Sequence, residues 1–417
     1  MTSSASTRID RCRLCGSTEL RPVLDLGEMT LTGFFPRAGE RVSTAPLEVV
    51  RCAGDDACHL VQLRHSAPAT EMFGGRYGYR SALNRSMVEH LRSKAASLLA
   101  RHPLAAGDVV LDIGSNDGTS LGFYPASARR VGIDPTAARF AEHYPTGVHV
   151  VPEFFSAEAF LRASGGARAA IVSSIAMFYD LEAPLEFARE VREILAPGGL
   201  WHFEQSYLPR MLDTGSYDTI CHEHLEYYAY AQIRWMLRRL GGFKVVEVSQ
   251  NEVNGGSFAV TVQRGDGAFE EAPEVHELAD REAALGLDGP APYDRFVERA
   301  RSQREELIGI VNRMVAGGAT VAGLGASTKG NVLLQYCGLG PGLLSCVAEV
   351  NPDKFGCFTP GTNVPIVSEG EAEARRPDVY LVLPWHFRDG IRARSRQVFS
   401  RGGRLLFPLP RVELVDS

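Results

Sequence analysis

The stretch Val109-Val-Leu-Asp-Ile-Gly-Ser-Asn-Asp-Gly-Thr119 joins an apolar run to a glycine-rich turn. The run predicts a buried strand, and the two glycines let the backbone turn tightly and approach a ligand before a helix begins. This order predicts an α/β sheet with a nucleotide-type pocket. Asp112, Gly114, Asn116 and Gly118 are its candidate cofactor contacts, and a βα turn without a ligand is the alternative.

A second short strand ends in a carboxylate. Val131-Gly-Ile133 is followed by Asp134, twenty residues after Gly114. In an α/β sheet this position offers a carboxylate to a ribose diol. Asp134 therefore joins the candidate cofactor contacts and favours a bound nucleotide over a bare turn.

The alternation of strands and helices continues along the chain. Residues 169–174 read as a strand, residues 185–195 as an amphipathic helix, and Ala196-Pro-Gly-Gly199 as the turn into the next strand. Such a Pro-Gly-Gly turn is common in methyltransferases that use S-adenosylmethionine. We therefore expect this cofactor, with Met177 near its adenine.

Composition argues against several classes of partner. The 417-residue chain has a formal net charge of −6, 23% charged residues and no basic run, which disfavours nucleic acid and polybasic membrane contacts. No stretch approaches eighteen consecutive apolar residues, so we expect no membrane span and a soluble, cytoplasmic protein. A small molecule is the expected partner, and a monomer is the expected state.

Four of the eight cysteines lie in the first 58 residues. Cys12 and Cys15 form a C-x2-C knuckle, and Cys52 and Cys58 form a looser C-x5-C pair. Four thiolates on two short turns suit a structural, tetrahedral Zn²⁺ that would stabilise a lobe with too small a core of its own. Four unconnected thiols, or His59 in place of one ligand, are the alternatives.

A second glycine turn opens the C-terminal part of the chain. Ala319-Thr-Val-Ala-Gly-Leu-Gly-Ala-Ser-Thr-Lys-Gly-Asn331 predicts another strand, loop and helix N-terminus. Such loops bind phosphate through backbone N–H groups and the helix dipole, and Lys329 adds a positive charge for a pyrophosphate. Lys329 is a candidate substrate contact, and so is Glu349, which lies in the next predicted strand. Two glycine loops in separate units indicate two nucleotide-like ligands across a cleft.

The most reactive stretch is Tyr217-Asp-Thr-Ile-Cys-His-Glu-His-Leu-Glu-Tyr-Tyr228. A histidine oriented by a neighbouring carboxylate is a general base near neutral pH. His222-Glu-His224 does not match H-E-x-x-H, so we expect no catalytic zinc here. For each single histidine the alternative is a packing residue.

A base beside a methyl donor suits a substrate with an acidic carbon. A carbon next to a ketone is acidic because its conjugate base is an enolate, and the nucleotide of a keto-sugar nucleotide would suit the second glycine loop. His224 would remove the proton, the enolate would attack the methyl group of S-adenosylmethionine, and Glu223 or tyrosines would hold the ketone oxygen. Tyr77 and Tyr79 lie on a glycine-rich loop and are candidates for a hydrogen bond to a substrate oxygen. Aromatic packing is the alternative for both.

Several motifs, taken together, carry a resemblance to a known family. They are Cys12-Arg-Leu-Cys15, Leu31-Thr-Gly-Phe-Phe-Pro36, Tyr77-Gly-Tyr-Arg-Ser81, Asp112-Ile-Gly-Ser-Asn-Asp-Gly118, His222-Glu-His224, Asn254-Gly-Gly-Ser257, Gly325 to Asn331 and Phe358-Thr-Pro-Gly-Thr-Asn363. Over essentially its whole length the chain resembles the nucleotide-sugar C-methyltransferases of antibiotic deoxysugar pathways, which methylate C-3 of a dTDP-4-keto-2,6-dideoxyhexose. The resemblance implies that His224 is the base and that Glu223 and Tyr79 are active-site partners.

The chain departs from that family at two places. Members commonly carry tyrosine where this chain has Cys221, next to His222, and many have a tighter second zinc pair. A thiol donates a weaker hydrogen bond than a phenol and is shorter, so it leaves room. Cys221 and His222 nevertheless remain candidate catalytic residues.

The expected architecture has three parts. Residues 1–68 form a zinc-binding lobe, residues 69–268 a Rossmann-like domain for S-adenosylmethionine, and residues 269–417 a C-terminal Rossmann-like domain for the nucleotide sugar. Helices within residues 269–318 connect the last two parts. Asn254, in the Asn-Gly-Gly turn between the last two strands of the central domain, is a further candidate substrate contact.

Two other functions fit parts of the pattern. A glycine loop followed by Asp134 also suits NADPH, which would give a ketoreductase, alone or as a second activity in the same pocket. A zinc-containing nucleotide-sugar sensor or scaffold is the non-enzymatic alternative.

Overall fold

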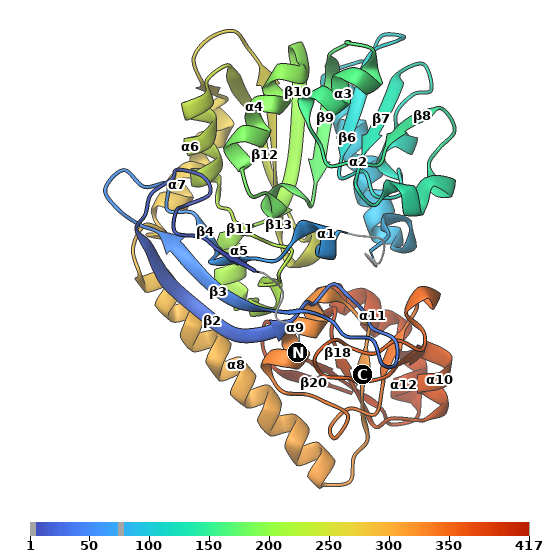
Figure 1. Cartoon of the computed structure of the whole chain (residues 1–417). Helices are drawn as coiled ribbons and strands as arrows, with labels where there is room; N and C mark the ends of the chain where they lie inside the picture. Colours follow the sequence, from blue (N-terminus) through green and yellow to red (C-terminus); the bar gives the residue numbers. More distant parts are fainter. Residues whose placement is uncertain (1–5, 74–78, 417) are drawn as a thin grey trace.

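The structure is a computed structural model that describes residues 6–73 and 79–416. Figure 1 shows its three sheet-based parts: an eight-stranded central sheet, a four-stranded N-terminal sheet and a six-stranded C-terminal sheet. The expected α/β fold, with a small N-terminal lobe and a further C-terminal α/β unit, is confirmed. Tyr77 lies outside the described residues.

The central sheet is built around β6 (Val109–Ile113), whose five residues are all buried. On one side lie β7 (Arg129–Ile133) and β8 (Val148–Val151), and on the other lie β9 (Ala169–Ile175) and β10 (Leu195–Ser206). The chain reverses its direction across the sheet beside β6, and a ligand crevice opens at such a switch point. The sheet continues through β13 (Ser257–Arg264), β12 (Phe243–Asn251) and β14 (Glu270–Glu271).

Helices cover both faces of this sheet. On one face α2 (Arg85–Arg101) packs against Val110, while Val109 and Leu111 point to the other face, because successive side chains of a strand alternate. The second face is covered by α3 (Ala157–Ser164), α4 (Pro184–Ile194), α6 (Tyr230–Leu240) and α7 (His276–Ala283). Two short helices are α1 (Ala69–Met72) and α5 (Leu208–Thr214).

The N-terminal sheet contains a strand from the middle of the chain. Its order is β11-β4-β3-β2, with β2 (Leu20–Thr30), β3 (Thr44–Cys52), β4 (Val61–Leu63) and β11 (Glu226–Tyr227). Residues 217–228, the reactive stretch, therefore end as an edge strand of the N-terminal lobe. The separate pair is β1 (Thr7–Arg8) with β5 (His65–Ser66).

A long helix, α8 (Ala291–Ala316), leads to the C-terminal unit along one side of the molecule (Figure 1). Its 26 residues span about 39 Å. No helix in the described part of the chain combines the length and the apolar character needed to cross a bilayer. Because β14 joins the central sheet, that sheet extends three residues past the expected boundary at residue 268.

The C-terminal sheet repeats the parallel pattern of the central one. Its order is β17-β16-β15-β18-β19-β20, and only the last pair, β19 with β20, is antiparallel. The strands are β15 (Val321–Leu324), β16 (Val347–Glu349), β17 (Ile366–Ser368), β18 (Val379–Val382), β19 (Arg404–Phe407) and β20 (Glu413–Val415). The helices are α9 (Thr328–Tyr336), α10 (Glu369–Ala374), α11 (Arg388–Arg394) and α12 (Arg396–Ser400).

Candidate active site

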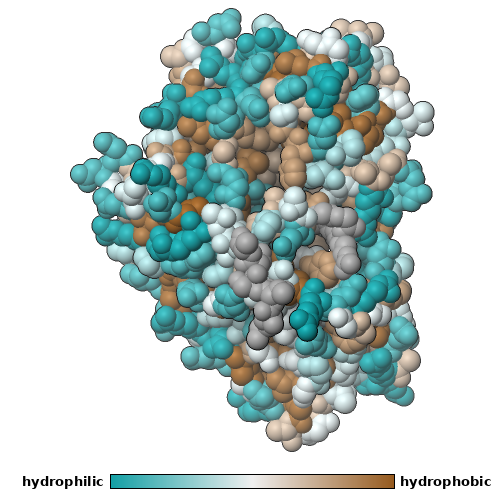
Figure 2. All heavy atoms as spheres, in the orientation of Figure 1, coloured by the Kyte–Doolittle hydropathy of each residue, from teal (hydrophilic) through white to brown (hydrophobic). Residues whose placement is uncertain are grey.

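A cavity of about 500 Å³ lies between the central sheet, the reactive stretch and the C-terminal unit. Figure 2 shows the molecular surface hollowed between the upper and lower parts of the chain. The residues that line the cavity include the loops after β6, β7 and β9, the pair Glu223 and His224, and residues 327–329 at the start of α9. One space therefore joins both glycine loops to the reactive stretch.

The loop after β6 approaches Met177 closely. Gly114 has a φ of +72°, and a Cβ atom there would lie 3.0 Å from Met177 Cγ. Both residues line the cavity, as does Asp112. Burial raises the pKa of Asp112 to about 7, and its Oδ1 accepts a hydrogen bond from Ser173. Three expected cofactor contacts thus meet at one end of the cavity.

Asp134 also lines the cavity and braces the loop. Its Oδ2 accepts the N–H of Asn116 at 2.8 Å, and its Oδ1 accepts the N–H and hydroxyl of Thr136, each at 2.6 Å. A carboxylate has about four acceptor positions, so Asp134 can accept a further bond from a ligand hydroxyl.

The side chain of Asn116 holds the segment that carries Tyr79. Its Oδ1 accepts the N–H of Ser81 at 3.0 Å, and its Nδ2 donates to the carbonyl oxygen of Tyr79 at 3.1 Å. Tyr79 lines the cavity with 44% of its surface exposed. Gly118 instead packs on Tyr144 and is not among the described residues that line the cavity.

His224 presents one ring nitrogen as a proton acceptor. Its Nδ1 lies 3.0 Å from the carbonyl oxygen of Thr219 and must donate, because a carbonyl only accepts; the lone pair is therefore on Nε2. The ring lies 4.2 Å, centroid to centroid, from that of Tyr179. Burial, and then the charge of Lys329, lower the pKa of His224 to about 3. The imidazole is therefore neutral near pH 7.

Two carboxyl groups share the cavity lining with this imidazole. Glu223 lines the cavity, and burial raises its pKa. Asp180, in the loop after β9, also lines the cavity, and burial followed by the charges of Glu223 and Glu226 raises its pKa well above the usual range. Its Oδ1 is buried and has no hydrogen-bond partner in the described part of the chain. Asp180 had no motif in the sequence to mark it.

Cys221 and His222 lie behind the cavity wall, where the thiol of Cys221 hydrogen-bonds to the Glu223 carboxyl group. The N–H of His224 donates to the carbonyl oxygen of Cys221 at 3.1 Å, which closes a turn, so the two histidines do not share a face. His222 is 2% exposed, and its Nε2 lies 3.0 Å from the carbonyl oxygen of Ala45 in β3. Neither Cys221 nor His222 is among the described residues that line the cavity.

The opposite wall comes from the C-terminal unit. Lys329 Nζ donates to the carbonyl oxygen of Asn254 at 2.6 Å, and both residues line the cavity. Asn254 has a φ of +55°, which turns its carbonyl toward the neighbouring unit. His386, which sequence reasoning missed, joins this wall, and its Nδ1 is buried without a partner among the described residues. His386 follows β18, and the carboxyl end of β18 lies beside that of β15. This position after a parallel strand was the feature of the sequence that could have predicted His386 as a site residue.

Glu349 supports a loop and is not among the described residues that line the cavity. Its Oε2 accepts the N–H of Ala326 at 2.8 Å, and its Oε1 accepts those of Val350 and Asn351. It occupies the place in the C-terminal unit that Asp134 occupies in the central one.

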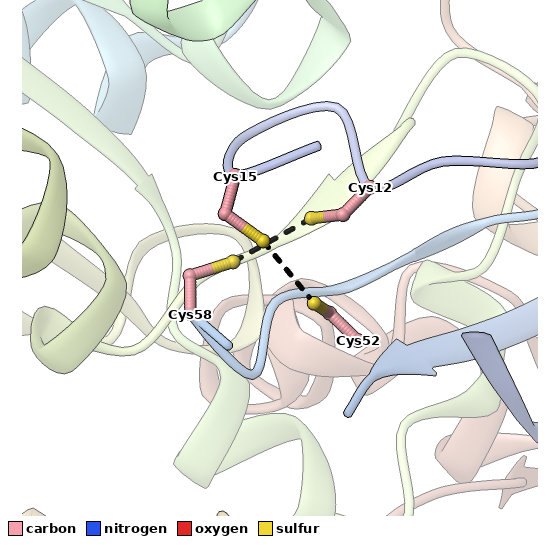
Figure 3. Close-up of side chains that lie close together, drawn as sticks. All are labelled: Cys12, Cys15, Cys52 and Cys58. Carbon is pink, nitrogen blue, oxygen red and sulfur yellow. Dashed lines mark hydrogen bonds between the residues drawn. The ribbon is translucent and has the colours of Figure 1, made fainter. Parts of the chain in front are cut away.

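The four N-terminal cysteines converge on one point (Figure 3). Their sulfur atoms all lie within 4.8 Å of one another, with Cys12 and Cys58 at 3.5 Å and Cys15 and Cys52 at 3.4 Å. Tetrahedral zinc with Zn–S bonds of about 2.3 Å needs sulfur atoms about 3.8 Å apart. The set therefore fits structural zinc despite the wide spacing of the second pair, and His59 is not part of it.

Three families match the chain: "Putative zinc binding domain" at residues 12–73, "Methyltransferase domain" at residues 87–248 and "C-methyltransferase C-terminal domain" at residues 252–410. A curated relative, C-methyltransferase NovU from Streptomyces niveus, is 32% identical over 419 residues, which cover 98% of this chain and 97% of NovU.

Among solved structures, N-methyltransferase NodS from Bradyrhizobium japonicum WM9 is similar at 14% identity and a TM-score of 0.33, over 44% of this chain and 99% of NodS. The magnesium protoporphyrin IX methyltransferase from Synechocystis PCC 6803, with bound S-adenosylmethionine, matches at 15% identity and a TM-score of 0.33. That match covers 43% of this chain and 79% of the other.

Proposed function

We propose, from the premise that this chain belongs to the C-methyltransferase family, that it methylates a carbon next to the ketone of a keto-sugar nucleotide. The chain is an S-adenosylmethionine-dependent C-methyltransferase with a zinc-binding lobe. The proposal concerns its substrate and the residues that act on it. The observation that carries it is the single cavity shared by the cofactor loop, His224 and the start of α9.

At the cofactor end, Gly114, Asp134 and Met177 would hold the cofactor, with Asp134 toward the ribose and Met177 toward the adenine. S-adenosylmethionine supplies an electrophilic methyl group on its sulfonium sulfur. A carbon acceptor must reach it as a carbanion or enolate, so the enzyme needs a base.

His224 is the proposed base. Its Nε2 is the free acceptor of a neutral ring, and removal of a proton from the carbon next to the ketone leaves an enolate. The ketone oxygen then carries negative charge and needs hydrogen-bond donors. Tyr79 can donate, and so can Asp180 and Glu223 when they are protonated. Cys221 lies outside the lining, so it is not assigned this contact.

At the other end, the start of α9 would receive the nucleotide diphosphate. Ser327 caps this helix by accepting the N–H of Gly330 at 3.1 Å, and Lys329 adds a positive charge. A helix N-terminus and a lysine together favour the negative charges of a diphosphate. Following the family resemblance, we propose a dTDP-4-keto-2,6-dideoxy sugar methylated at C-3, in deoxysugar and antibiotic biosynthesis.

The two other functions find no specific support. Two of the matching domain families and the curated relative are methyltransferases. Neither the NADPH-dependent ketoreductase nor the sensor or scaffold is therefore proposed.

The test combines proton exchange with methyl transfer. The enzyme is incubated with a dTDP-4-keto-2,6-dideoxyhexose in D2O, with and without ¹³CH3-labelled S-adenosylmethionine, and the products are analysed by NMR. We expect label on the sugar C-3, deuterium exchange at that carbon, and loss of both in His224→Asn. Label on oxygen, nitrogen or no sugar atom would overturn the proposal.

A further inference from the structure

The segment Thr30–Pro36, which begins at the last residue of β2, is hydrogen-bonded to the C-terminal unit at both ends. The backbone N–H of Thr30 donates to Gln335 Oε1 at 2.9 Å, and Gln335 Nε2 donates back to the carbonyl oxygen of Thr30 at 3.0 Å. At the other end, the N–H of Phe358 donates to the carbonyl oxygen of Pro36 at 2.8 Å. Gln335 belongs to α9. The two bonds to Gln335 therefore attach the segment to helix α9, so the two should move together.

Thr32, in the middle of this segment, contacts both α9 and Glu223. It is 0% exposed. Its carbonyl oxygen accepts Asn331 Nδ2 at 2.7 Å, and Asn331, in the first turn of α9, is itself 0% exposed. The hydroxyl of Thr32 donates to Glu223 Oε2 at 3.4 Å. Thr32 thus links the start of α9, which lines the cavity, to a carboxyl group in the same lining.

Gly33 leaves the space that Glu223 fills. A methyl group at Gly33 would overlap Glu223 Oε1 and would lie 3.8 Å from the hydroxyl of Thr328. The φ of Gly33 is not positive, so close approach of the carboxyl group, and not backbone conformation, accounts for the glycine here.

The hydrogen bond from Thr32 also acts on the charge of Glu223. Burial raises the pKa of this carboxyl group, and the bonds from Cys221 and Thr32 work in the opposite direction. The other titratable groups that interact with Glu223 are Asp180, in the loop after β9, and Tyr227 in β11.

We propose that Thr32 and Gly33 are positioning residues for Glu223, which hold its carboxyl group at the cavity wall and tie its position to helix α9. This rests on the proposed function, in which the nucleotide binds at the start of α9 and Glu223 contacts the sugar. The Leu31-Thr-Gly-Phe-Phe-Pro36 motif then serves the active site and not only the lobe that contains it. Binding of the nucleotide and placement of the carboxyl group become linked through Asn331 and Thr32.

The first test compares Thr32→Val, which keeps the shape of threonine but has no hydroxyl, with Thr32→Ser, which keeps the donor. We expect Thr32→Val to lower kcat for methylation about tenfold, the equivalent of one lost hydrogen bond, with the Kd for S-adenosylmethionine unchanged. Thr32→Ser should stay within about threefold of wild type. Equal losses in both variants, or none in either, would overturn the proposal.

The second test needs no substrate, so it separates the positioning role from the proposed function. The pKa of Glu223 is measured by ¹³C carboxyl NMR, with the signal assigned by its loss in Glu223→Gln. Because the hydroxyl of Thr32 stabilises the charged form, Thr32→Val should raise this pKa and Thr32→Ser should restore it. An unchanged pKa in Thr32→Val overturns the positioning role even if methylation proceeds as proposed. If wild type does not methylate the sugar, the proposed function fails and this measurement still decides.

Gly33→Ala provides a steric test with a matched control. It should displace Glu223 and lower kcat more than Thr32→Val does, because the added methyl group overlaps the carboxyl group. Gly342→Ala is the control, since a Cβ there meets nothing within 4 Å and the φ of Gly342 is not positive. Wild-type kcat in Gly33→Ala would contradict the proposal.

Discussion

Nδ1 of His224 lies 3.0 Å from the carbonyl oxygen of Thr219, which fixes the proton on that nitrogen and leaves Nε2 as the acceptor of a ring that lines the cavity. His224→Asn keeps a polar side chain but removes this acceptor. We expect kcat to fall by about 10² to 10⁴, the usual loss when a general base is removed. His276→Asn, an exposed histidine of α7, is the control for a histidine-to-asparagine change away from the cavity. Near-normal kcat in His224→Asn would exclude the base.

The charge of Lys329 should set the basicity of His224. Lys329 holds the pKa of His224 low, after burial, so Lys329→Met should raise that pKa from about 3. A bound diphosphate would offset the same charge, so thymidine diphosphate should also raise the pKa in wild type. NMR of ring-labelled histidine follows both effects, with His224→Asn to assign the signal. No response to the nucleotide would mean that it binds away from Lys329.

Asp180 should make stability depend on pH. Its pKa is raised in the folded protein, whereas an unfolded aspartate titrates near about 4. The folded state therefore binds more protons above that pH, and stability falls as pH rises from about 4 toward the folded pKa. Asp180→Asn removes this loss, so its advantage in the free energy of unfolding should grow with pH.

Urea unfolding at pH 4.5 and 7.5 measures this difference. Asp280→Asn, an exposed position of α7, is the control, and we expect it to show little change between the two pH values. An Asp180→Asn variant whose advantage is the same at both pH values would show that the carboxyl group does not titrate differently in the two states.

The residues that the sequence could predict are those fixed by local patterns. Gly114 and Asp134 follow apolar strands, and parallel strands bring their carboxyl ends to one edge, so their meeting followed from strand order. The spacing of the four N-terminal cysteines likewise predicted a zinc site. The longer C-x5-C loop still brings its two sulfur atoms to within 4.8 Å of the other two.

The residues that sequence reasoning missed depend on contacts between distant segments. Gln62 of β4 pairs with Glu226 of β11, and no local signal predicts that pairing. Thr32 reaches Glu223 only because this pairing and α9 hold three parts of the chain together. The sequence alone could not tell which of His222 and His224 lines the cavity. Alternation along a strand would place both side chains on one face, whereas the observed turn directs them to different sides.

Loss of zinc should affect the active site through the pairing of β4 with β11. Cys15→Ser should lower the zinc content from about one ion per chain and reduce both the melting temperature and kcat, because Cys12 accepts a hydrogen bond from Gln62, which pairs with β11. Cys357→Ser, outside the cluster, should keep its zinc. Elemental analysis and thermal unfolding measure the two quantities. Full activity without zinc would show that the lobe does not support the reactive stretch.

The close approach of Gly114 to Met177 gives the most specific prediction about the cofactor. Gly114→Ala introduces two separate costs: a residue with a side chain at a φ of +72°, and a methyl group 3.0 Å from Met177 Cγ. A side chain in the left-handed region costs about 1 to 2 kcal/mol, which the loop relieves by moving away from the cofactor position, so affinity for S-adenosylmethionine should fall by calorimetry. Gly114→Ala with Met177→Ala relieves only the contact, so it should recover part of the loss relative to Met177→Ala alone. Full recovery would mean that backbone conformation contributes nothing, and unchanged affinity in Gly114→Ala would place the cofactor elsewhere.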